Sequence, residues 1–208
     1  MAALKEAKCA LRELIKQRLG QLTEQERQIQ STIIHRKVLA SNIFKNSNRI
    51  SIFLSMKEEV NTYPVVQSIL DAGKQCFIPN CDGTDMIMVP FRSMDEEKTF
   101  TKSHFGVSQP AKFEPDEDAN RSGGLDLMFM PGLGFSKEGH RLGRGRGYYD
   151  KYLEICSNTG KMPKTIALIF KEQLLDHIPT GEHDMSVDYL LYPTDEEVEE
   201  IKKSPKSI

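Results

Sequence analysis

A short run near residue 145 alternates glycine with arginine. The stretch HRLGRGRGYYDKYL, residues 140–153, places three glycines and three arginines directly before two tyrosines and an aspartate. Glycine lets the main chain approach phosphate oxygens closely, and arginine adds charge and a planar fork that pairs two oxygens at once. The combination predicts a binding site for a polyphosphate.

Other interpretations of this run compete with a phosphate site. A glycine-rich loop is often only a turn. Alternating arginine and glycine is also typical of RNA-binding tails, but those are long, whereas this is one short copy. The run matches neither the Gly-x-x-x-x-Gly-Lys-[Ser/Thr] phosphate loop nor the Gly-x-Gly-x-x-Gly dinucleotide fingerprint. The elements around the run must therefore decide between these interpretations.

Those elements favour the phosphate site. The buried run LDLMFMP (125–131) predicts a strand, a loop covers 131–147, and a helix is expected from about 148 to 157. The helix is predicted from residues that recur on one face, Tyr149, Leu153 and Cys156. In an open α/β sheet, ligands collect beyond the carboxyl ends of the strands, and a helix start favours an anion through its unpaired N–H groups.

The first 45 residues predict a pair of helices. Apolar residues recur at helical spacing from 3 to 19, and Gly20 is the expected stop. Thr23 and Glu26 form a capping-box pattern, which predicts a second helix running to about Phe44. We expect this pair, residues 3–45, to pack on an α/β core.

Short buried strands and helices follow. RISIFLSM (49–56) and QCFIP (75–79) flank a helix that Thr62 would cap and Gly73 would end, which makes a βαβ unit. KTIALIF (164–170) predicts another buried strand. The expected fold class is therefore α/β, a three-layer domain with a mainly parallel sheet and helices on both faces.

Two regions are less informative. Residues 81–122 are irregular, although MIMVP (86–90) is a candidate edge strand and FEPDEDANRSGG (113–124) a candidate exposed loop. Residues 196–208 are polar and predict a tail that follows a single domain of residues 1–195.

Composition excludes several classes of protein. The formal net charge of −2 over 208 residues argues against a general nucleic-acid binder. The four cysteines form no Cys-x-x-Cys pair and are expected to be reduced thiols. The N-terminus lacks a secretory apolar region, and no run approaches the roughly 18 apolar residues of a membrane span. We therefore expect a cytoplasmic protein, and a monomer because no heptads appear.

Five blocks together resemble the 5-formyltetrahydrofolate cyclo-ligase family, also called methenyltetrahydrofolate synthetase. PGLGFSKEGHRLGRGRGYYDKYL (131–153) is similar to the family signature, and KCALR (8–12) to its N-terminal basic motif. ISIFLSMKEEV (50–60) is similar to its folate-contacting segment. ALIFKEQ (167–173) and EHDMSVD (182–188) are similar to its C-terminal pair, and all five blocks stand in the expected order.

The resemblance implies conversion of 5-formyltetrahydrofolate to 5,10-methenyltetrahydrofolate, with ATP as co-substrate, Mg²⁺ as cofactor, and ADP and phosphate as products. The formyl oxygen leaves an amide-like carbon poorly, so N10 cannot displace it directly. Transfer of the γ-phosphoryl group to that oxygen would form an imidate phosphate, which N10 then attacks. The protein would align the two substrates and neutralise charge on the moving group.

The resemblance also implies a role for each matching residue. ATP would bind to Lys8, Cys9, Ala10, Leu11, Arg12, Arg141, Leu142, Gly143, Arg144, Gly145, Arg146, Gly147, Tyr148 and Tyr149. Arg144 would act on the transferred group, with Arg146 as a second catalytic residue. The folate would contact Leu54, Met56, Glu59, Arg144, Gly145, Arg146, Gly147 and Tyr148, with Lys171 and Gln173 as further candidates. Asp150 and Asp184 would hold magnesium, which prefers oxygen ligands and usually takes one or two carboxylates beside nucleotide phosphates.

Two other functions remain open from the residues themselves. A sugar-phosphate isomerase would also suit a glycine loop on a parallel sheet, but it needs neither ATP nor a KCALR-like element. A non-enzymatic nucleotide- or RNA-binding module could use the Arg-Gly run, although the chain is acidic overall. ATP consumption that depends on formylfolate separates the three functions.

Overall fold

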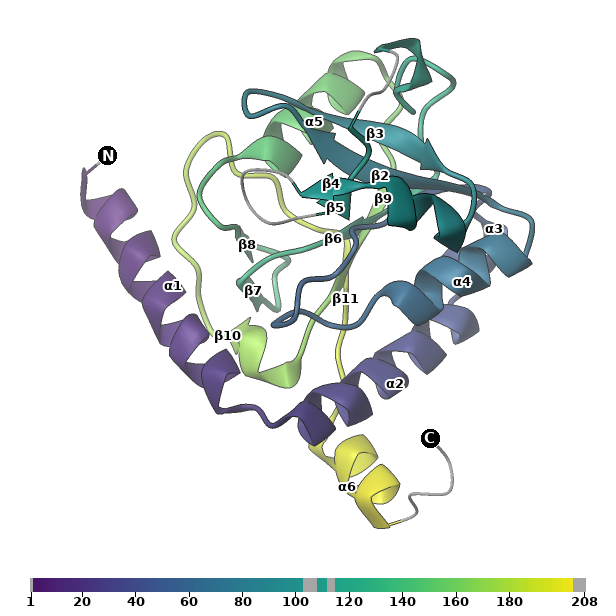
Figure 1. The fold of residues 1–208 in the computed structure, drawn as a ribbon. Helices are drawn as coiled ribbons and strands as arrows, with labels where there is room; N and C mark the ends of the chain where they lie inside the picture. Colours follow the sequence, from purple (N-terminus) through teal and green to yellow (C-terminus); the bar gives the residue numbers. More distant parts are fainter. Residues whose placement is uncertain (1, 103–107, 112–114, 204–208) are drawn as a thin grey trace.

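A six-stranded sheet forms the centre of the computed structural model, which describes residues 2–102, 108–111 and 115–203 (Figure 1). Its strands lie in the order β11-β9-β6-β1-β2-β3. Their bounds are β1 Arg49–Ser51, β2 Gln75–Cys81, β3 Met86–Phe91, β6 Leu127–Met130, β9 Lys164–Leu168 and β11 Tyr189–Leu191. Neighbours are parallel except β2 and β3, so the βαβ unit is confirmed; β3 is at the edge, as predicted, and runs antiparallel to β2.

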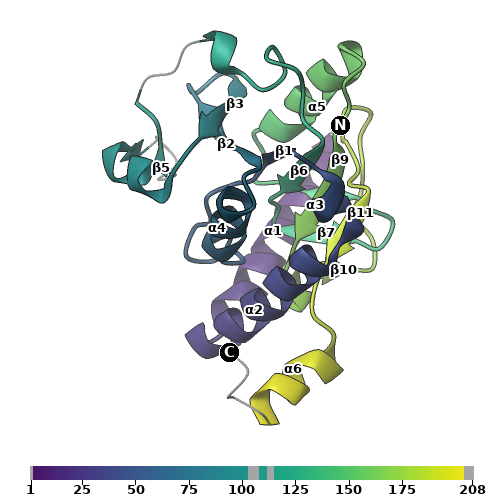
Figure 2. The ribbon, with the colours of Figure 1, turned by 90° about the vertical axis from the view of Figure 1, so that its right-hand side faces the viewer.

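Helices cover both faces of this sheet (Figures 1 and 2). The helices of the described residues are α1 Ala2–Gln21, α2 Glu24–Ala40, α3 Asn42–Asn46, α4 Tyr63–Asp71, α5 Tyr148–Asn158 and α6 Asp195–Lys203, of which α6 packs on α2 and not on the sheet. Along β6, Leu127 and Phe129 pack with α2 and α4, whereas Met128 and Met130 pack with α5. This alternation of buried residues confirms the three-layer α/β fold.

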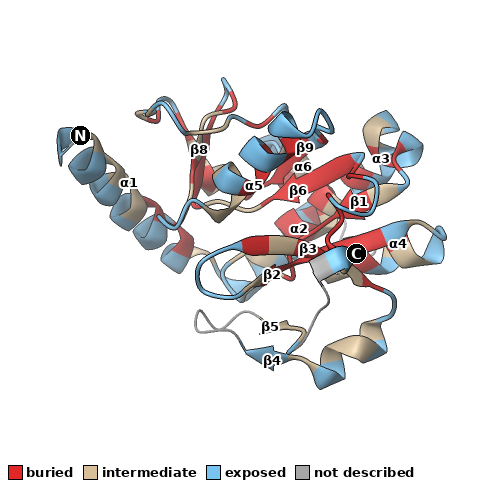
Figure 3. Cartoon of the chain, turned by 90° about the horizontal axis from the view of Figure 1, so that it is seen from above, coloured by how far each residue is buried: buried red, intermediate tan, exposed pale blue. Residues whose placement is uncertain are grey.

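The N-terminal helical pair is present, with one difference. The Thr23 hydroxyl accepts the Glu26 N–H at 3.2 Å, and the Glu26 carboxylate accepts the Thr23 N–H at 2.9 Å, so the predicted capping box is confirmed. The second helix ends at Ala40, and the short α3 follows it. The carboxyl-terminal half of α1 packs on the core through the buried side chains of Ile15 and Leu19, while its amino-terminal half is largely exposed (Figure 3).

The stretch predicted as a strand from 49 to 56 leaves the sheet early. Only Arg49–Ser51 form β1, after which the chain turns into a loop. The Thr62 hydroxyl donates to the Phe53 carbonyl at 2.7 Å and accepts the Ser55 N–H at 3.1 Å. Thr62 is the N-cap residue of α4, as predicted, and its carbonyl accepts the Val66 N–H at 2.9 Å, but its side chain fixes this loop and makes no capping bond to the helix.

Small elements fill regions that were expected to be loops. A second sheet has the order β10-β7-β8, from Leu174–Leu175, Gly134–Ser136 and Arg141–Leu142. The two-stranded ribbon of β4 Thr101–Lys102 and β5 Ser108–Gln109 lies in the irregular middle region. The 3₁₀ segments are η1 Met94–Thr99, η2 Pro115–Glu117 and η3 Lys171–Gln173.

The carboxyl-terminal polar stretch was expected to be a tail, but residues 195–203 form the helix α6. Val198 and Ile201, three residues apart, pack on Ile29 and Ile33 of α2. The helix was not predicted because its exposed face is polar, which leaves only these two apolar residues to indicate a buried face. The end of the predicted tail, 204–208, lies outside the described residues.

Among the residues described, no helix combines the length and apolar composition that a membrane crossing needs.

Gly139, in the turn that joins β7 to β8, should not tolerate a side chain. Its φ is +87°, and a Cβ there would lie 2.3 Å from the Val187 carbonyl oxygen. We expect Gly139→Ala to lower the free energy of unfolding by about 2–5 kcal/mol, from the backbone penalty and the clash together. Urea denaturation measures the loss.

Gly160→Ala is the matched control, because Gly160 also has a positive φ, +69°, but nothing lies within 4 Å of the added Cβ. The free energy of unfolding of Gly160→Ala should fall only by the cost of placing a Cβ on a positive-φ backbone, about 1–2 kcal/mol. Equal losses in the two variants would show that the contact with Val187 is not what excludes a side chain at Gly139.

Candidate active site

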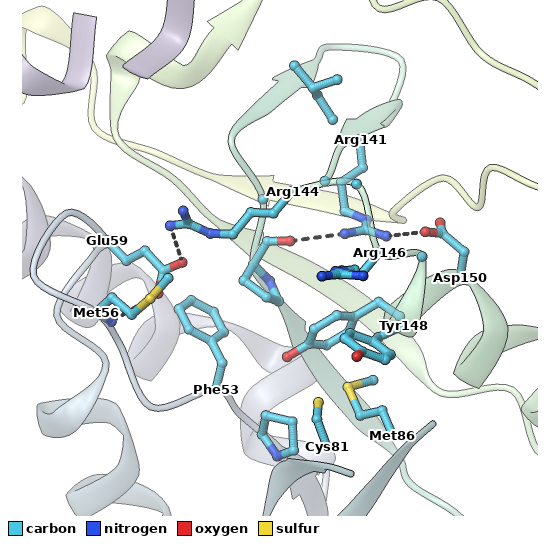
Figure 4. Close-up of a pocket in the computed structure, with 18 of the residues that line it drawn as sticks. Phe53, Met56, Glu59, Cys81, Met86, Arg141, Arg144, Arg146, Tyr148 and Asp150 are labelled. Carbon is cyan, nitrogen blue, oxygen red and sulfur yellow. Dashed lines mark hydrogen bonds and ion pairs between the residues drawn. The ribbon is translucent and has the colours of Figure 1, made fainter. Parts of the chain in front are cut away.

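One cavity of about 530 Å³ opens where the central strands end (Figure 4). Phe53 and Leu54 follow β1, Pro79 and Cys81 belong to the end of β2, and Pro131 follows β6. These are carboxyl ends of neighbouring strands, the place where α/β sheets usually bind ligands. Helix α1 and the loop of residues 141–147, here called the Gly–Arg loop, close the other side.

The Gly–Arg loop brings the predicted residues into this cavity. All residues from Arg141 to Asp150 line it. Gly145 and Gly147 have φ values of +104° and +71°, which glycine adopts without strain, and Gly147 directly precedes the first residue of α5. The backbone N–H groups of the first turn of α5 therefore adjoin the cavity, beside three arginines.

Arg141 is the buried member of the arginine set. Only 6% of its side chain is exposed, and its Nη2 donates to Asp150 Oδ2 at 2.7 Å. Its Nη1 donates to the Pro131 carbonyl at 3.3 Å, and the guanidinium lies 5.6 Å from the centre of the Tyr149 ring. A buried charge must be paired, so Arg141 ties the end of β6 to the start of α5.

Helix α1 contributes Lys8 and Arg12, as the sequence predicted. Lys8 is ion-paired with Asp184, and Arg12 Nε donates to the Gly143 carbonyl at 2.8 Å. Of the other predicted nucleotide-site residues on this helix, Cys9 and Ala10 are exposed and outside the cavity lining, and Leu11 packs on the core. The spacing of four residues decides which side chains face the site.

Asp184 and Asp150 lie on the same wall of the cavity. Asp184 accepts the Gly181 N–H at 2.6 Å, and Asp150 Oδ1 accepts the N–H of Met185 at 3.1 Å. Burial would raise the pKa of Asp184, but the bonds from Lys8 and Gly181 and the nearby positive charges outweigh it and lower that pKa. The carboxylate is therefore ionised at neutral pH.

These two carboxylates fit a magnesium site. No cluster of three or more metal-ligating side chains exists in the described part of the chain. Magnesium needs only one or two carboxylates when phosphate oxygens and water complete its shell. Two carboxylates, one in the first turn of α5 and one on the loop of residues 181–184, beside a phosphate-type loop, meet that requirement.

The predicted folate segment faces the Gly–Arg loop. Leu54, Met56 and Glu59 all line the cavity, and Arg144 Nη2 lies 3.0 Å from Glu59 Oε1 (Figure 4). Tyr148 also lines the cavity, and its hydroxyl donates to the Gly83 carbonyl at 2.9 Å. Arg146 lies between Arg141 and Tyr148 in this view.

Two further candidates for folate contact lie elsewhere. Lys171 is ion-paired with Asp195, and neither Lys171 nor Gln173 lines the cavity. The buried Gln173 donates to the Gly132 carbonyl at 2.7 Å. Gln173 thus holds the backbone of Gly132, which lines the cavity, without lining the cavity itself.

Several lining residues were not predicted, namely Phe53, Pro79, Cys81, Met86, Gln109, Pro131 and Gly132. Pro79 ends the strand predicted for residues 75–79, and Cys81 follows shortly after it, so the rule on carboxyl ends of strands could have found both. Gln109 has no such signal, because its side chain reaches the site by bonding both backbone groups of Cys81.

The Cys81 thiol provides a test of this environment. Burial, with the negative charge of Asp82, raises the pKa of Cys81 to about 11. Only the thiolate reacts with iodoacetamide, so the labelling rate at Cys81 should still be rising above pH 10. Peptide mass spectrometry resolves this rate from that of the exposed Cys9. A plateau for Cys81 below pH 9 would contradict the buried setting.

Known proteins resemble the chain along almost its whole length. The family model described as the 5-formyltetrahydrofolate cyclo-ligase family matches residues 4–193. The chain is 48% identical over 189 residues to the 5-formyltetrahydrofolate cyclo-ligase of Mus musculus, covering 89% of this chain and 93% of that protein. It is 33% identical over 198 residues to the probable 5-formyltetrahydrofolate cyclo-ligase of Caenorhabditis elegans, covering 92% and 95%.

A solved structure has the same fold. The NMR structure of Aquifex aeolicus 5,10-methenyltetrahydrofolate synthetase aligns with a TM-score of 0.69 at 24% identity and covers 88% of each chain. The family match spans the five blocks that line or support the cavity, from the basic face of α1 to the loop that carries Asp184. The chain belongs to the 5-formyltetrahydrofolate cyclo-ligase family.

Proposed function

We propose that this chain converts 5-formyltetrahydrofolate to 5,10-methenyltetrahydrofolate in a reaction that consumes MgATP and releases ADP and phosphate. Family membership supports the reaction class. The observation that carries the proposal is one cavity whose opposite walls are the Gly–Arg loop and the Leu54–Glu59 segment, in contact through Arg144 and Glu59. An enzyme that moves a phosphoryl group between two substrates needs such a shared cavity.

ATP would bind at the charged end of the cavity. The backbone N–H groups at the start of α5 and the Lys8, Arg12, Arg141, Arg144 and Arg146 side chains offer donors to the phosphates. Arg12 already holds the loop main chain at Gly143. The positive charges would be neutralised by the phosphates, which is the arrangement that phosphoryl transfer requires.

The reduced folate would bind at the end formed by Leu54, Met56 and Glu59. The Glu59 carboxylate, 11% exposed, is a fixed acceptor because Oε2 also accepts the Met56 N–H at 3.0 Å. A carboxylate can accept the paired N–H donors on the pyrimidine edge of a pterin. The apolar walls would exclude water from the ring system.

Asp150 and Asp184 would hold magnesium. The ion, when bound, would neutralise charge on the phosphates and orient them. Lys8 and Arg141, which pair with these carboxylates, would keep both fixed in direction.

In the reaction, Arg144 would donate to the γ-phosphoryl oxygens as the formyl oxygen attacks phosphorus and the bond to ADP breaks. The imidate phosphate that results has a good leaving group on its carbon. N10 then attacks that carbon and gives up its proton to solvent, and phosphate leaves with the former formyl oxygen as the ring closes. The loop and the folate segment would contribute alignment and charge stabilisation, without covalent participation.

Three further properties stay predictions from the sequence. We expect the chain to be a cytoplasmic monomer, to act on small molecules, and to bind neither nucleic acid nor membranes.

Release of inorganic phosphate tests the proposal against the alternatives. Phosphate should appear only when the chain, MgATP and 5-formyltetrahydrofolate are all present, in a 1:1 ratio to the folate consumed. An isomerase or a binding module would release none above background. Phosphate release that is independent of the folate would contradict the proposed coupling.

A further inference from the structure

The Arg144–Glu59 ion pair joins two loops that are 85 residues apart in the sequence. Glu59 is the anchored partner. Its Oε2 accepts the Met56 N–H at 3.0 Å, and its own N–H donates to the Met56 carbonyl at 3.0 Å. The carboxylate is thus fixed by the backbone of its own loop, and its other oxygen faces Arg144.

Arg144 is the adjustable partner. Its side chain is 46% exposed, compared with 6% for Arg141, whose guanidinium is held by Asp150 and Pro131. Arg12 anchors the main chain at Gly143, and Gly145 on the other side carries no side chain. The direction of the Arg144 guanidinium therefore depends on its contact with Glu59.

We infer that Glu59 is a positioning residue for Arg144 in addition to its role in folate binding, an inference that rests on the proposed function. Arginine has five donors in a planar fork, so one N–H can remain on Glu59 while others face an oxygen. The carboxylate holds the guanidinium at the junction of the two ends of the cavity. That junction is where the formyl oxygen would meet the γ-phosphate.

The substitution Glu59→Gln separates the two roles. If the new amide oxygen accepts the Met56 N–H, the amide NH₂ group faces the Arg144 guanidinium, and two donors oppose each other. If the amide is flipped, its oxygen accepts from Arg144, but its NH₂ group then opposes the Met56 N–H. Arg144 loses its anchor in the first case and the loop loses its bond in the second. With both substrates saturating, we expect kcat to fall about 10-fold to 100-fold, the scale that a misplacement of about 1 Å can cost.

A double-mutant cycle with Arg144→Ala identifies the positioning role. In the Arg144→Ala background, Glu59→Gln should lower kcat by no more than about twofold, because the residue that it positions is gone. The KM for the folate should rise in both backgrounds. Kcat losses that multiply, or a Glu59→Gln variant with raised KM and unchanged kcat, would overturn the inference.

A measurement without turnover tests the ion pair itself. The ¹⁵N–¹H signal of the Arg144 side chain, assigned by its absence from Arg144→Ala, should shift in Glu59→Gln and stay in place in Glu58→Gln. Glu58 is the control because it is exposed in the same loop and does not line the cavity. An unchanged signal in Glu59→Gln would overturn the inference.

The same measurement separates this inference from the proposed function. If the wild-type chain makes no product while the Arg144 signal responds to Glu59→Gln, the ion pair exists and the assigned reaction is wrong. If the chain is active and the kcat losses multiply, the reaction stands and the positioning role is wrong.

Discussion

Arg144→Ala is expected to lower kcat by about 10²–10³, the usual cost of removing one transition-state donor. Arg144 lies on the exposed Gly–Arg loop and contacts Glu59 across the cavity, so alanine removes a charge without opening the core. The free energy of unfolding should change little. Steady-state kinetics with both substrates saturating, with urea denaturation alongside, measures the two effects separately.

Lys151→Ala is the control for this substitution. Lys151 is an exposed cation seven residues further along, and it does not line the cavity. Its removal should leave kcat unchanged, which would exclude a general effect of net charge on a substrate as anionic as ATP. An Arg144→Ala enzyme with nearly full turnover would remove Arg144 from the catalytic role.

Loss of either proposed metal ligand is the second large effect. We expect Asp150→Asn and Asp184→Asn each to raise the magnesium concentration required for half-maximal activity. Loss of an outer-shell partner typically costs about 10–100-fold in metal affinity, and loss of a direct ligand should cost at least as much. Titration of activity with magnesium at fixed ATP gives the shift.

The Asp150→Asn and Asp184→Asn variants should differ in their free energy of unfolding. Asp150 neutralises Arg141, which is 6% exposed, and removal of one partner of a buried pair costs up to about 3–5 kcal/mol. Asp184 and its partner Lys8 are 27% and 15% exposed, so Asp184→Asn should be milder. If both variants fold and keep the wild-type dependence on magnesium, these carboxylates do not hold the metal.

The sequence predicted the fold well where a pattern is local. The capping box at Thr23 and the buried apolar runs of the strands each depend on a few neighbouring residues, and both are present. The β10-β7-β8 sheet was missed because strands of two or three residues are too short to show periodicity. Helix α6 was missed because only Val198 and Ile201 mark its buried face.

The residues of the site were likewise predictable where the pattern is local, and not where they depend on long-range packing. The Gly–Arg loop was a candidate phosphate site from its residue types, because glycine and arginine each have a specific use around phosphate, and the strand and helix predicted around it favoured that interpretation. That Glu59 would face Arg144 could not be predicted, since the contact depends on how two distant loops pack. Met86 and Gln109 reach the cavity through the β2–β3 pairing and through bonds to Cys81, neither of which leaves a mark in the local sequence.

Near-ultraviolet absorbance of methenyltetrahydrofolate is the most direct test of the central claim. The purified chain would be mixed with the active stereoisomer of 5-formyltetrahydrofolate, ATP and magnesium, and omission of each in turn supplies the controls. We predict a rise in absorbance that needs both ATP and magnesium. A well-folded chain that gives no rise under these conditions would contradict the proposed reaction.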